Sequence, residues 1–373
     1  MKRKKIALAA LAVAGALALS ACSVRVETLF AANWLRAPSA GYDDNYYEKL
    51  TYGLTFAADE GSSLSVQIEA ENSSFTMETE ALAGWTHGDT TYTPVYRLRT
   101  ELTLSASYVY TAEDGTQTTV AAFGGENDTP ESDADDPAKE ITEVWFRSKA
   151  DGGNLEPICS TSTYYSYSPA GMSSSGVYLY NYSVNIEYTE NGNVAAIKYT
   201  DHWADLAEGE AQVSDNLLKA RLFDTEERTY SGLQDDYTAV DHGQLLFAGR
   251  GIGFTSAEES GHTLTVFTPN YGAQNVSLTC SEIATRTFTF DLIPVDETEE
   301  IITEHQIAVA SVTASVISNG GNGGPSHTVY YAQKGSDSDN PYYCMPIQIE
   351  KPFGFGIGTM TLSLTEAVHK GPE

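Results

Sequence analysis

Alternating apolar and polar residues run through most of the chain and predict a protein built mainly of β-strands. Leu64, Val66 and Ile68 fall on one face, because successive side chains of a strand point to opposite sides. The stretches 50–57 and 96–104 follow the same period of two. Further strands are predicted at 244–254, 262–268, 275–280, 284–292, 306–317, 327–333, 345–350 and 357–365.

Two turn signals mark β-hairpins. Asp114-Gly115 and Asn191-Gly192 each separate two strand-like runs. A two-residue hairpin turn requires a positive φ, which asparagine, aspartate and glycine adopt at low cost. Both segments are therefore predicted to fold back as hairpins.

Helix is scarce in this pattern. The best candidate is 214–223, where Ser214 can cap the first turn. The acidic segment 124–138 and the glycine-rich segment 318–326 are predicted loops. Because strand signals continue on both sides of each loop, the sequence predicts one large antiparallel β domain.

The first residues carry a different pattern, that of an export signal. Four basic residues precede an apolar run at 6–19, and small residues follow it. The run is too short to cross the hydrocarbon core of a membrane as a helix. Residues 1–21 are therefore predicted to be a cleaved signal peptide.

The end of this signal, Leu-Ser-Ala-Cys at residues 19–22, resembles the lipobox of bacterial lipoproteins. The resemblance implies cleavage before Cys22 and a diacylglycerol on its thiol; an ordinary signal with a chance cysteine is the alternative. Two acyl chains make a stable membrane anchor. We expect an exported protein, lipid-anchored to the extracytoplasmic face of a bacterial membrane. Its lipidated tether would span 22–42 and its β domain 43–373, with no transmembrane helix in the mature chain.

Charge narrows the range of partners. The net charge is −30, and loss of residues 1–21 removes four basic residues and no acidic one, which makes it −34. Such a surface repels nucleic acid and anionic headgroups, so nucleic-acid binding is excluded. The membrane contact is then expected through the lipid on Cys22. The oligomeric state is left open.

The remaining cysteines do not form a complete disulfide framework. Of the four cysteines, Cys22 is the predicted lipid site, which leaves Cys159, Cys280 and Cys344. An odd number permits at most one bridge among them. A single disulfide and three buried thiols are both compatible with the sequence.

No catalytic motif stands out. His202, His242 and His305 each neighbour a carboxylate, but none has the spacing of a metalloprotease, and no Cys-x-x-Cys occurs. Serine is abundant enough to leave a Ser-His-Asp arrangement open, yet no Gly-x-Ser-x-Gly turn supports one. We expect a protein without enzymatic activity, and the sequence assigns no catalytic residue.

Cofactor and metal signals are equally weak. The glycines of 249–254 lack the following helix of a dinucleotide loop, so they indicate a bulge or bend in a strand. The acidic runs 133–136 and 337–340 offer oxygen ligands for calcium but lack the glycine and final glutamate of an EF-hand. No cofactor and no metal site are predicted.

Tyrosines gather in one part of the chain. Such rings either stack as pairs across neighbouring strands, the interpretation that we favour, or form a platform for glycans. The group comprises Tyr164, Tyr165, Tyr167, Tyr178, Tyr180 and Tyr182.

Several stretches together resemble a family of bacterial envelope proteins with the LolA-like fold. They are 146–165 with its Gly-x-Leu-x-Pro corner, 243–254, 329–332, 339–350 and 358–364, in this order within residues 43–366. The resemblance implies an open antiparallel half-barrel closed by short helices. It also implies an apolar concave face that holds acyl chains or lipoproteins.

These expectations lead to one function and one alternative. The first is an envelope lipoprotein that binds an apolar or amphipathic ligand, a lipid or a lipoprotein acyl chain, on the concave sheet face. The alternative is a surface module that binds glycan or protein, or a structural envelope component. The sequence assigns no ligand-binding residue under either.

Overall fold

The computed structural model describes most of the chain after residue 45. The predicted signal peptide, the tether with Cys22, the loop 318–326 and nearly all of the loop 124–138 lie outside the described residues. Those described are 46–93, 95–123, 138–148, 155–169, 177–202, 217–219, 227–235, 237–252, 254, 256–257, 262–269, 271–294, 301–317, 327–333, 342, 344–353 and 357–370.

One sheet of 16 strands organises the molecule and confirms the mainly β prediction. In spatial order its strands are β14 (Glu227–Ser231), β12 (Val194–Asp201), β11 (Val177–Thr189), β10 (Leu155–Pro169), β9 (Ala138–Ser148), β6 (Val95–Leu104), β3 (Ser74–Leu82), β1 (Tyr47–Ala58), β21 (Gly358–Lys370), β20 (Pro346–Phe353), β19 (His327–Ala332), β18 (Ile302–Val316), β17 (Gly272–Pro294), β16 (His262–Thr268) and β15 (Thr238–Asp241), with β13 (Leu217–Lys219) beside β11.

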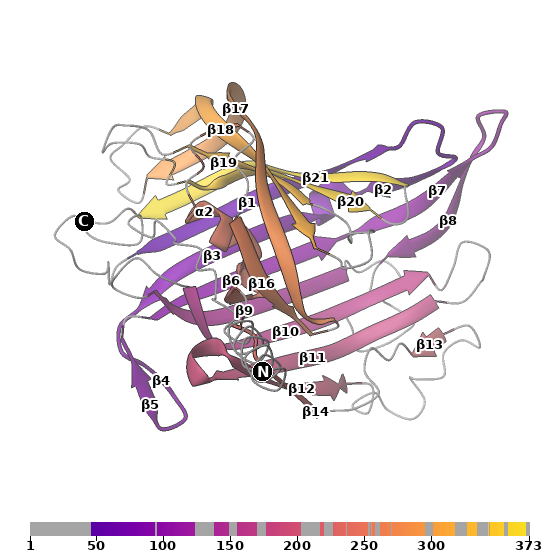
Figure 1. Ribbon diagram of the computed structural model, residues 1–373. Helices are drawn as coiled ribbons and strands as arrows, with labels where there is room; N and C mark the ends of the chain where they lie inside the picture. The colour runs from indigo at the N-terminus through magenta and orange to yellow at the C-terminus, as the bar shows by residue number, and fades with distance from the viewer. Residues whose placement is uncertain are drawn as a thin grey trace, which may run out of the picture.

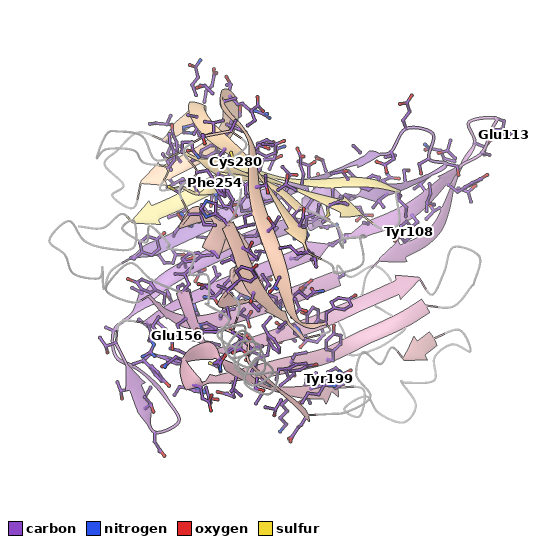
Figure 2. The ribbon with its side chains drawn as sticks, viewed as in Figure 1. Tyr108, Glu113, Glu156, Tyr199, Phe254 and Cys280 are labelled. Carbon is purple, nitrogen blue, oxygen red and sulfur yellow. The ribbon has the colours of Figure 1, made fainter. Side chains whose placement is uncertain are left out.

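Two small sheets extend from the 16-stranded sheet, which forms the wall of the molecule. The first contains β2 (Leu64–Ile68), β7 (Ala106–Thr111) and β8 (Gln117–Phe123), and the second contains β4 (Trp85–His87) and β5 (Thr90–Tyr92). Figure 2 shows Tyr108 and Glu113 on the β7–β8 hairpin, which projects away from the body. Both predicted hairpins are confirmed, with positive φ at Gly115 (83°) and Asn191 (58°).

The sheet curls over on itself through its longest strand. The N-terminal part of β17 pairs with β16, and β18 pairs with it from Val276 to Leu292. Its last residues, Asp291–Pro294, also lie parallel to Glu366–His369 of β21. Figure 1 shows β17 crossing in front of the large sheet, with α2 to its left in this view. The sheet is mostly antiparallel, as predicted. The three parallel pairings, β11–β13, β15–β16 and β17–β21, join strands that no hairpin connects.

Two sequence predictions are corrected. Residues 217–219 of the expected helix 214–223 form the short strand β13, because β11 offers its backbone as a partner. The expected strand at 244–254 is instead a 3₁₀ turn, His242–Gln244, followed by the helix α2, Leu245–Arg250.

A capping box begins the 3₁₀ turn that leads directly into this helix. The carboxylate of Asp241 accepts from the backbone N–H of Gly243 at 2.8 Å, and the side chain of Gln244 accepts from the N–H of Asp241 at 2.9 Å. Both bonds satisfy backbone donors that a helix start would otherwise leave unpaired. The apolar residues that follow show neither strand nor helix periodicity, so the capped turn ahead of them favours helix.

Among the described residues, packed apolar side chains fill much of the inner face of the curled sheet. Inward side chains of β1, such as Leu50 and Tyr52, join a core that includes Phe247 of α2. A second cluster packs β11 and β12 against Phe267 of β16. Tyr182 of this cluster stacks on Tyr164 across two strands at 4.5 Å between ring centroids, the cross-strand pairing predicted for the tyrosines. Figure 2 labels Cys280, which belongs to the main core, and Tyr199, which belongs to the second cluster.

An ion pair sits inside the main core. Arg250 at the end of α2 donates to both carboxylate oxygens of Glu48 on β1, at 2.6 and 2.9 Å, and both side chains are fully buried. Burial alone would lower the pKa of Arg250, but the charge of Glu48 more than offsets it and holds the pKa above its ordinary value. The pair fixes α2 against the wall.

Removal of one partner of this pair is expected to be costly. Glu48→Leu or Arg250→Met alone leaves an uncompensated buried charge, which costs about 3–5 kcal/mol of unfolding free energy, whereas the double substitution recovers most of that loss. Urea denaturation of the four forms measures the coupling. Arg286→Met, which removes an exposed pair with Glu282, is the control and should change stability little. Additive single losses would contradict a directly coupled pair.

Candidate functional site

A pocket of about 160 Å³ lies between the inner face of β3, β6 and β9 and the segment that leads into α2. Strands β19 and β20 complete it from the other side of the curl. Its lining residues are Phe75, Thr100, Leu102, Glu140, Thr142, His242, Gly243, Leu245, Leu246, His327 and Lys351.

Glycines bring the helical segment this close to the sheet. A Cβ at position 243 would lie 2.8 Å from Cγ2 of Thr142, and one at position 249 would lie 2.6 Å from Cζ of Tyr331. The hydroxyl of Tyr331 donates to the carbonyl of Leu246 at 2.8 Å. The glycine-rich stretch after residue 248 therefore serves a close helix–strand contact, and not the strand bulge that its sequence suggests.

A buried carboxylate holds the start of this segment. Asp241 is fully buried and accepts hydrogen bonds from Ser160 (2.7 Å), Tyr188 (2.5 Å) and the N–H of Gly243 (2.8 Å). Burial alone would raise the pKa of Asp241, but neighbouring His242 and the two hydroxyl donors outweigh it, and the pKa lies below its ordinary value. Asp241 is thus a fixed anion behind the pocket wall.

His242 stands between this anion and a serine. Its Nδ1 lies 3.0 Å from Oδ1 of Asp241, and its Nε2 lies 3.3 Å from Oγ of Ser162. Ser162 is 2% exposed and shares its hydroxyl with Thr142 at 2.9 Å, whereas a nucleophile needs an open approach. The arrangement positions the imidazole at the pocket wall.

The charge on His242 is favoured by its surroundings. Burial alone would lower the pKa of His242, but the charge and contact of Asp241, together with the charge of Glu140, raise it above the ordinary value. An imidazole that is readily protonated therefore lines one side of the pocket.

Two basic side chains reach the pocket from the opposite side. Lys351 continues the inward row of β20 after Ile347 and Ile349, and its ammonium lies 5.5 Å from the ring centroid of Phe75. His327 begins the inward row of β19 that continues with Val329 and Tyr331. Neither forms a hydrogen bond or an ion pair with another residue in the described part of the chain.

Enclosure acts on both groups. Burial lowers the pKa of Lys351, with the charge of Glu140 opposing this effect. Burial and then the charge of Lys351 lower the pKa of His327 to about 4. At neutral pH His327 is therefore an uncharged donor and acceptor beside an amine.

The outer face of the wall carries a different aromatic group. Trp145 of β9 stacks on Trp85 of β4 at 5.6 Å, and Trp85 stacks on His87 at 5.2 Å. His87 in turn lies 2.6 Å from the carboxylate of Glu187 on β11. These rings cover one another, so the group fastens the β4–β5 hairpin to the sheet; a glycan platform would need an open ring face.

The three described cysteines form no disulfide with one another. Cys159, Cys280 and Cys344 are all buried. Burial is the main reason why the pKa of Cys159 rises to about 12, so this thiol is unreactive at neutral pH. Cys22, the predicted lipid site, lies outside the described residues.

The other candidates are structural or cannot be placed. His202 contacts Oγ of Ser183 at 3.0 Å, and His305 contacts the hydroxyl of Tyr342 and the carbonyl of Phe290. The acidic runs 133–136 and 337–340 lie outside the described residues. Across the residues that are described, no three His, Cys, Asp or Glu side chains gather to hold a metal ion. Nor is any helix there long and apolar enough to span a bilayer.

Sequence reasoning overlooked the basic end of the pocket. The alternation of 327–331 and 347–351 places His327 and Lys351 at apolar, inward positions, and that mismatch is a readable signal. Their proximity to β3 and β9 depends on how the sheet curls, which the alternation does not contain.

The low pKa of His327 predicts a loss of stability in acid. The unfolded chain takes up a proton near pH 6.5, while the folded chain resists until about pH 4, so stability falls as the pH drops through this window. We expect the wild type to lose about 2 kcal/mol between pH 7.5 and pH 5 through this group, and His327→Gln to lack that share. Urea unfolding across the range measures it, with His202→Gln as the control. An unchanged acid slope in His327→Gln would contradict the expectation.

Comparisons with known proteins give only distant structural likenesses. No family model matches the chain, and no curated protein matches it. A beta-barrel-like protein of domain of unknown function DUF1849 from Brucella abortus has a TM-score of 0.43 and 10% identity, covering 88% of this chain and 99% of its own. A "putative lipoprotein" from Parabacteroides distasonis has a TM-score of 0.21 and 9% identity, covering 87% and 96%. A "putative exported protein with YmcC-like fold" from Bacteroides fragilis has a TM-score of 0.19 and 5% identity, covering 86% of this chain and 94% of its own.

Proposed function

We propose that the protein is a cell-envelope lipoprotein, anchored through Cys22, that holds one end of an amphipathic ligand in the pocket beneath α2. The observation that carries this proposal is the composition of the pocket wall. Apolar side chains line one part, and an amine with no ionic partner in the described chain lines another. A site with a few placed polar groups on an apolar wall suits a ligand with one polar end.

The apolar part supplies affinity. Phe75, Leu102, Leu245 and Leu246 face the same space from the sheet and from α2. Each methylene group of a ligand that leaves water against such a wall gains about 0.8 kcal/mol. The hydroxyls of Thr100 and Thr142 lie among them and can orient a polar group.

The size of the pocket limits what enters. Its 160 Å³ is below the ~300–1,000 Å³ typical of sites that enclose a drug-sized molecule. Among the described residues a packed core covers much of the inner face, whereas the LolA-like resemblance implies a wide apolar face. The ligand is therefore held by its end, and the remainder of a longer chain extends out of the pocket.

The site favours binding over catalysis. Ser162, the hydroxyl nearest to His242, is enclosed within the sheet and paired with Thr142. The stacked rings of Trp85 and Trp145 fasten a hairpin, so we rank the glycan-binding alternative second.

A bulky side chain in the pocket should expel the ligand. We expect Leu246→Trp to fill the space and to lower ligand occupancy at least tenfold, while the exposed control Ile302→Trp retains it. Native mass spectrometry of protein purified from its own membrane, followed by lipid extraction, measures the occupancy. Equal occupancy in Leu246→Trp would place the ligand elsewhere. If no amphiphile co-purifies and none binds on addition, the binding function is wrong.

The anchor is tested separately. The mature wild-type protein should partition into detergent and show the mass of a diacylglyceryl group on Cys22, whereas Cys22→Ser should lack both. Detergent partitioning and intact mass are the measurements. A membrane-bound mature protein from Cys22→Ser would overturn the lipid anchor.

A further inference from the structure

We propose that the ligand end held in the pocket is a monoanionic carboxylate, as in a fatty acid, bound by Lys351 and His327 with its alkyl chain against Phe75, Leu102 and Leu246. This inference rests on the proposed binding function and names its ligand class. It assigns a recognition role to two residues that the fold alone does not explain.

Lys351 is the first reason. It occupies an inward position in a row of isoleucines, where an apolar side chain would pack at lower cost. The chain contains 51 acidic and 21 basic residues, yet within the described residues no carboxylate pairs with this ammonium. Lys351 is half-buried, and a cation that is partly withdrawn from water is normally paired, so a ligand carboxylate supplies the close partner that the described residues do not.

The neighbours of Lys351 suit a carboxylate. His327 lies beside it, and burial together with Lys351 holds its pKa at about 4, so its ring is neutral and can donate one N–H. The hydroxyl of Thr100 lines the same pocket. A carboxylate accepts through two oxygens, and one ammonium with one or two neutral donors satisfies them.

Charge balance favours a single negative charge. Glu140 lines the pocket, and Asp241 lies behind His242, so the cation at Lys351 is already opposed by carboxylates at longer range. A phosphate ester carries ~1.5–2 negative charges at neutral pH and would meet repulsion that only one lysine offsets. A carboxylate adds one charge.

The orientation of the ligand follows from the wall. The ammonium lies 5.5 Å from the ring centroid of Phe75, so a carboxylate at Lys351 places its first methylene groups beside that ring. Leu102, which lies opposite Phe75 on the neighbouring strand, and Leu246 line the same pocket. The alkyl chain can therefore pack against these three side chains while the carboxylate meets the amine.

Three eight-carbon probes test the inference on the full chain: octanoate, 1-octanol and octyl phosphate, titrated by calorimetry at pH 7.5. A charge-assisted contact predicts that octanoate binds at least tenfold more tightly than octanol. Lys351→Met should remove that advantage and leave octanol binding unchanged. The exposed Lys198→Met on β12 is the matched control and should bind all probes as the wild type does.

Each other outcome has a defined meaning. Equal binding of octanoate and octanol, with no effect of Lys351→Met, overturns the carboxylate inference and leaves the amphipathic pocket standing. Tighter binding of octyl phosphate overturns it in favour of a phosphate head. Failure of all three probes overturns the binding function as well. Circular dichroism and the urea midpoint establish that Lys351→Met is folded, and Lys351→Arg, which keeps the charge, should retain preference for octanoate.

Discussion

The buried pair of Glu48 and Arg250 is the constraint on which the rest of the interior depends. Two charges without access to water are tolerated only when they satisfy each other, so the distance between β1 and the end of α2 is fixed within hydrogen-bond range. Arg250 thus fixes the C-terminal end of α2, and the capping box at Asp241 fixes the turn that leads into its N-terminal end. The short helix is thereby held over the inner face, and the pocket lies between the segment that leads into it and the sheet.

Local pattern predicted most of the wall, because a strand with one buried face must alternate. The strands β16 and β18 to β21 fall within a few residues of their predicted places. The predictions at 275–280 and 284–292 proved to be one strand, β17, whose irregularity between Cys280 and Glu282 is a register shift and not a turn. Helix α2 was missed because four consecutive apolar residues have no period, and the decisive signal was the pair Asp241 and Gln244 ahead of them.

The pocket was less predictable than the large sheet, because it depends on contacts between strands that are far apart in the sequence. That His327 and Lys351 point inward follows from alternation within their own strands. That they face Phe75 and Glu140 follows from the curl of the sheet, in which strands far apart in the sequence meet. His242 reaches the same space only because glycine at position 243 lets the turn approach Thr142. The site is therefore a product of long-range pairing, although each of its residues carries a local signal.

The register of β1 carries a consequence for how the chain reaches this state. Its strand lies between β3 and β21, and it pairs with β21 along its whole length, from Tyr47 opposite Lys370 to Ala58 opposite Gly358. The first described strand in the sequence therefore cannot complete its pairing until the last one is present. The loop that this pairing closes spans nearly all of the described chain. Such non-local pairing is slow to form, and until it forms β1 presents an unpaired edge open to other chains. If a polypeptide emerges from a membrane N-terminus first, β1 keeps this unpaired edge until the last strand has crossed. A chaperone that covers β1 at that stage would prevent it from pairing with other chains.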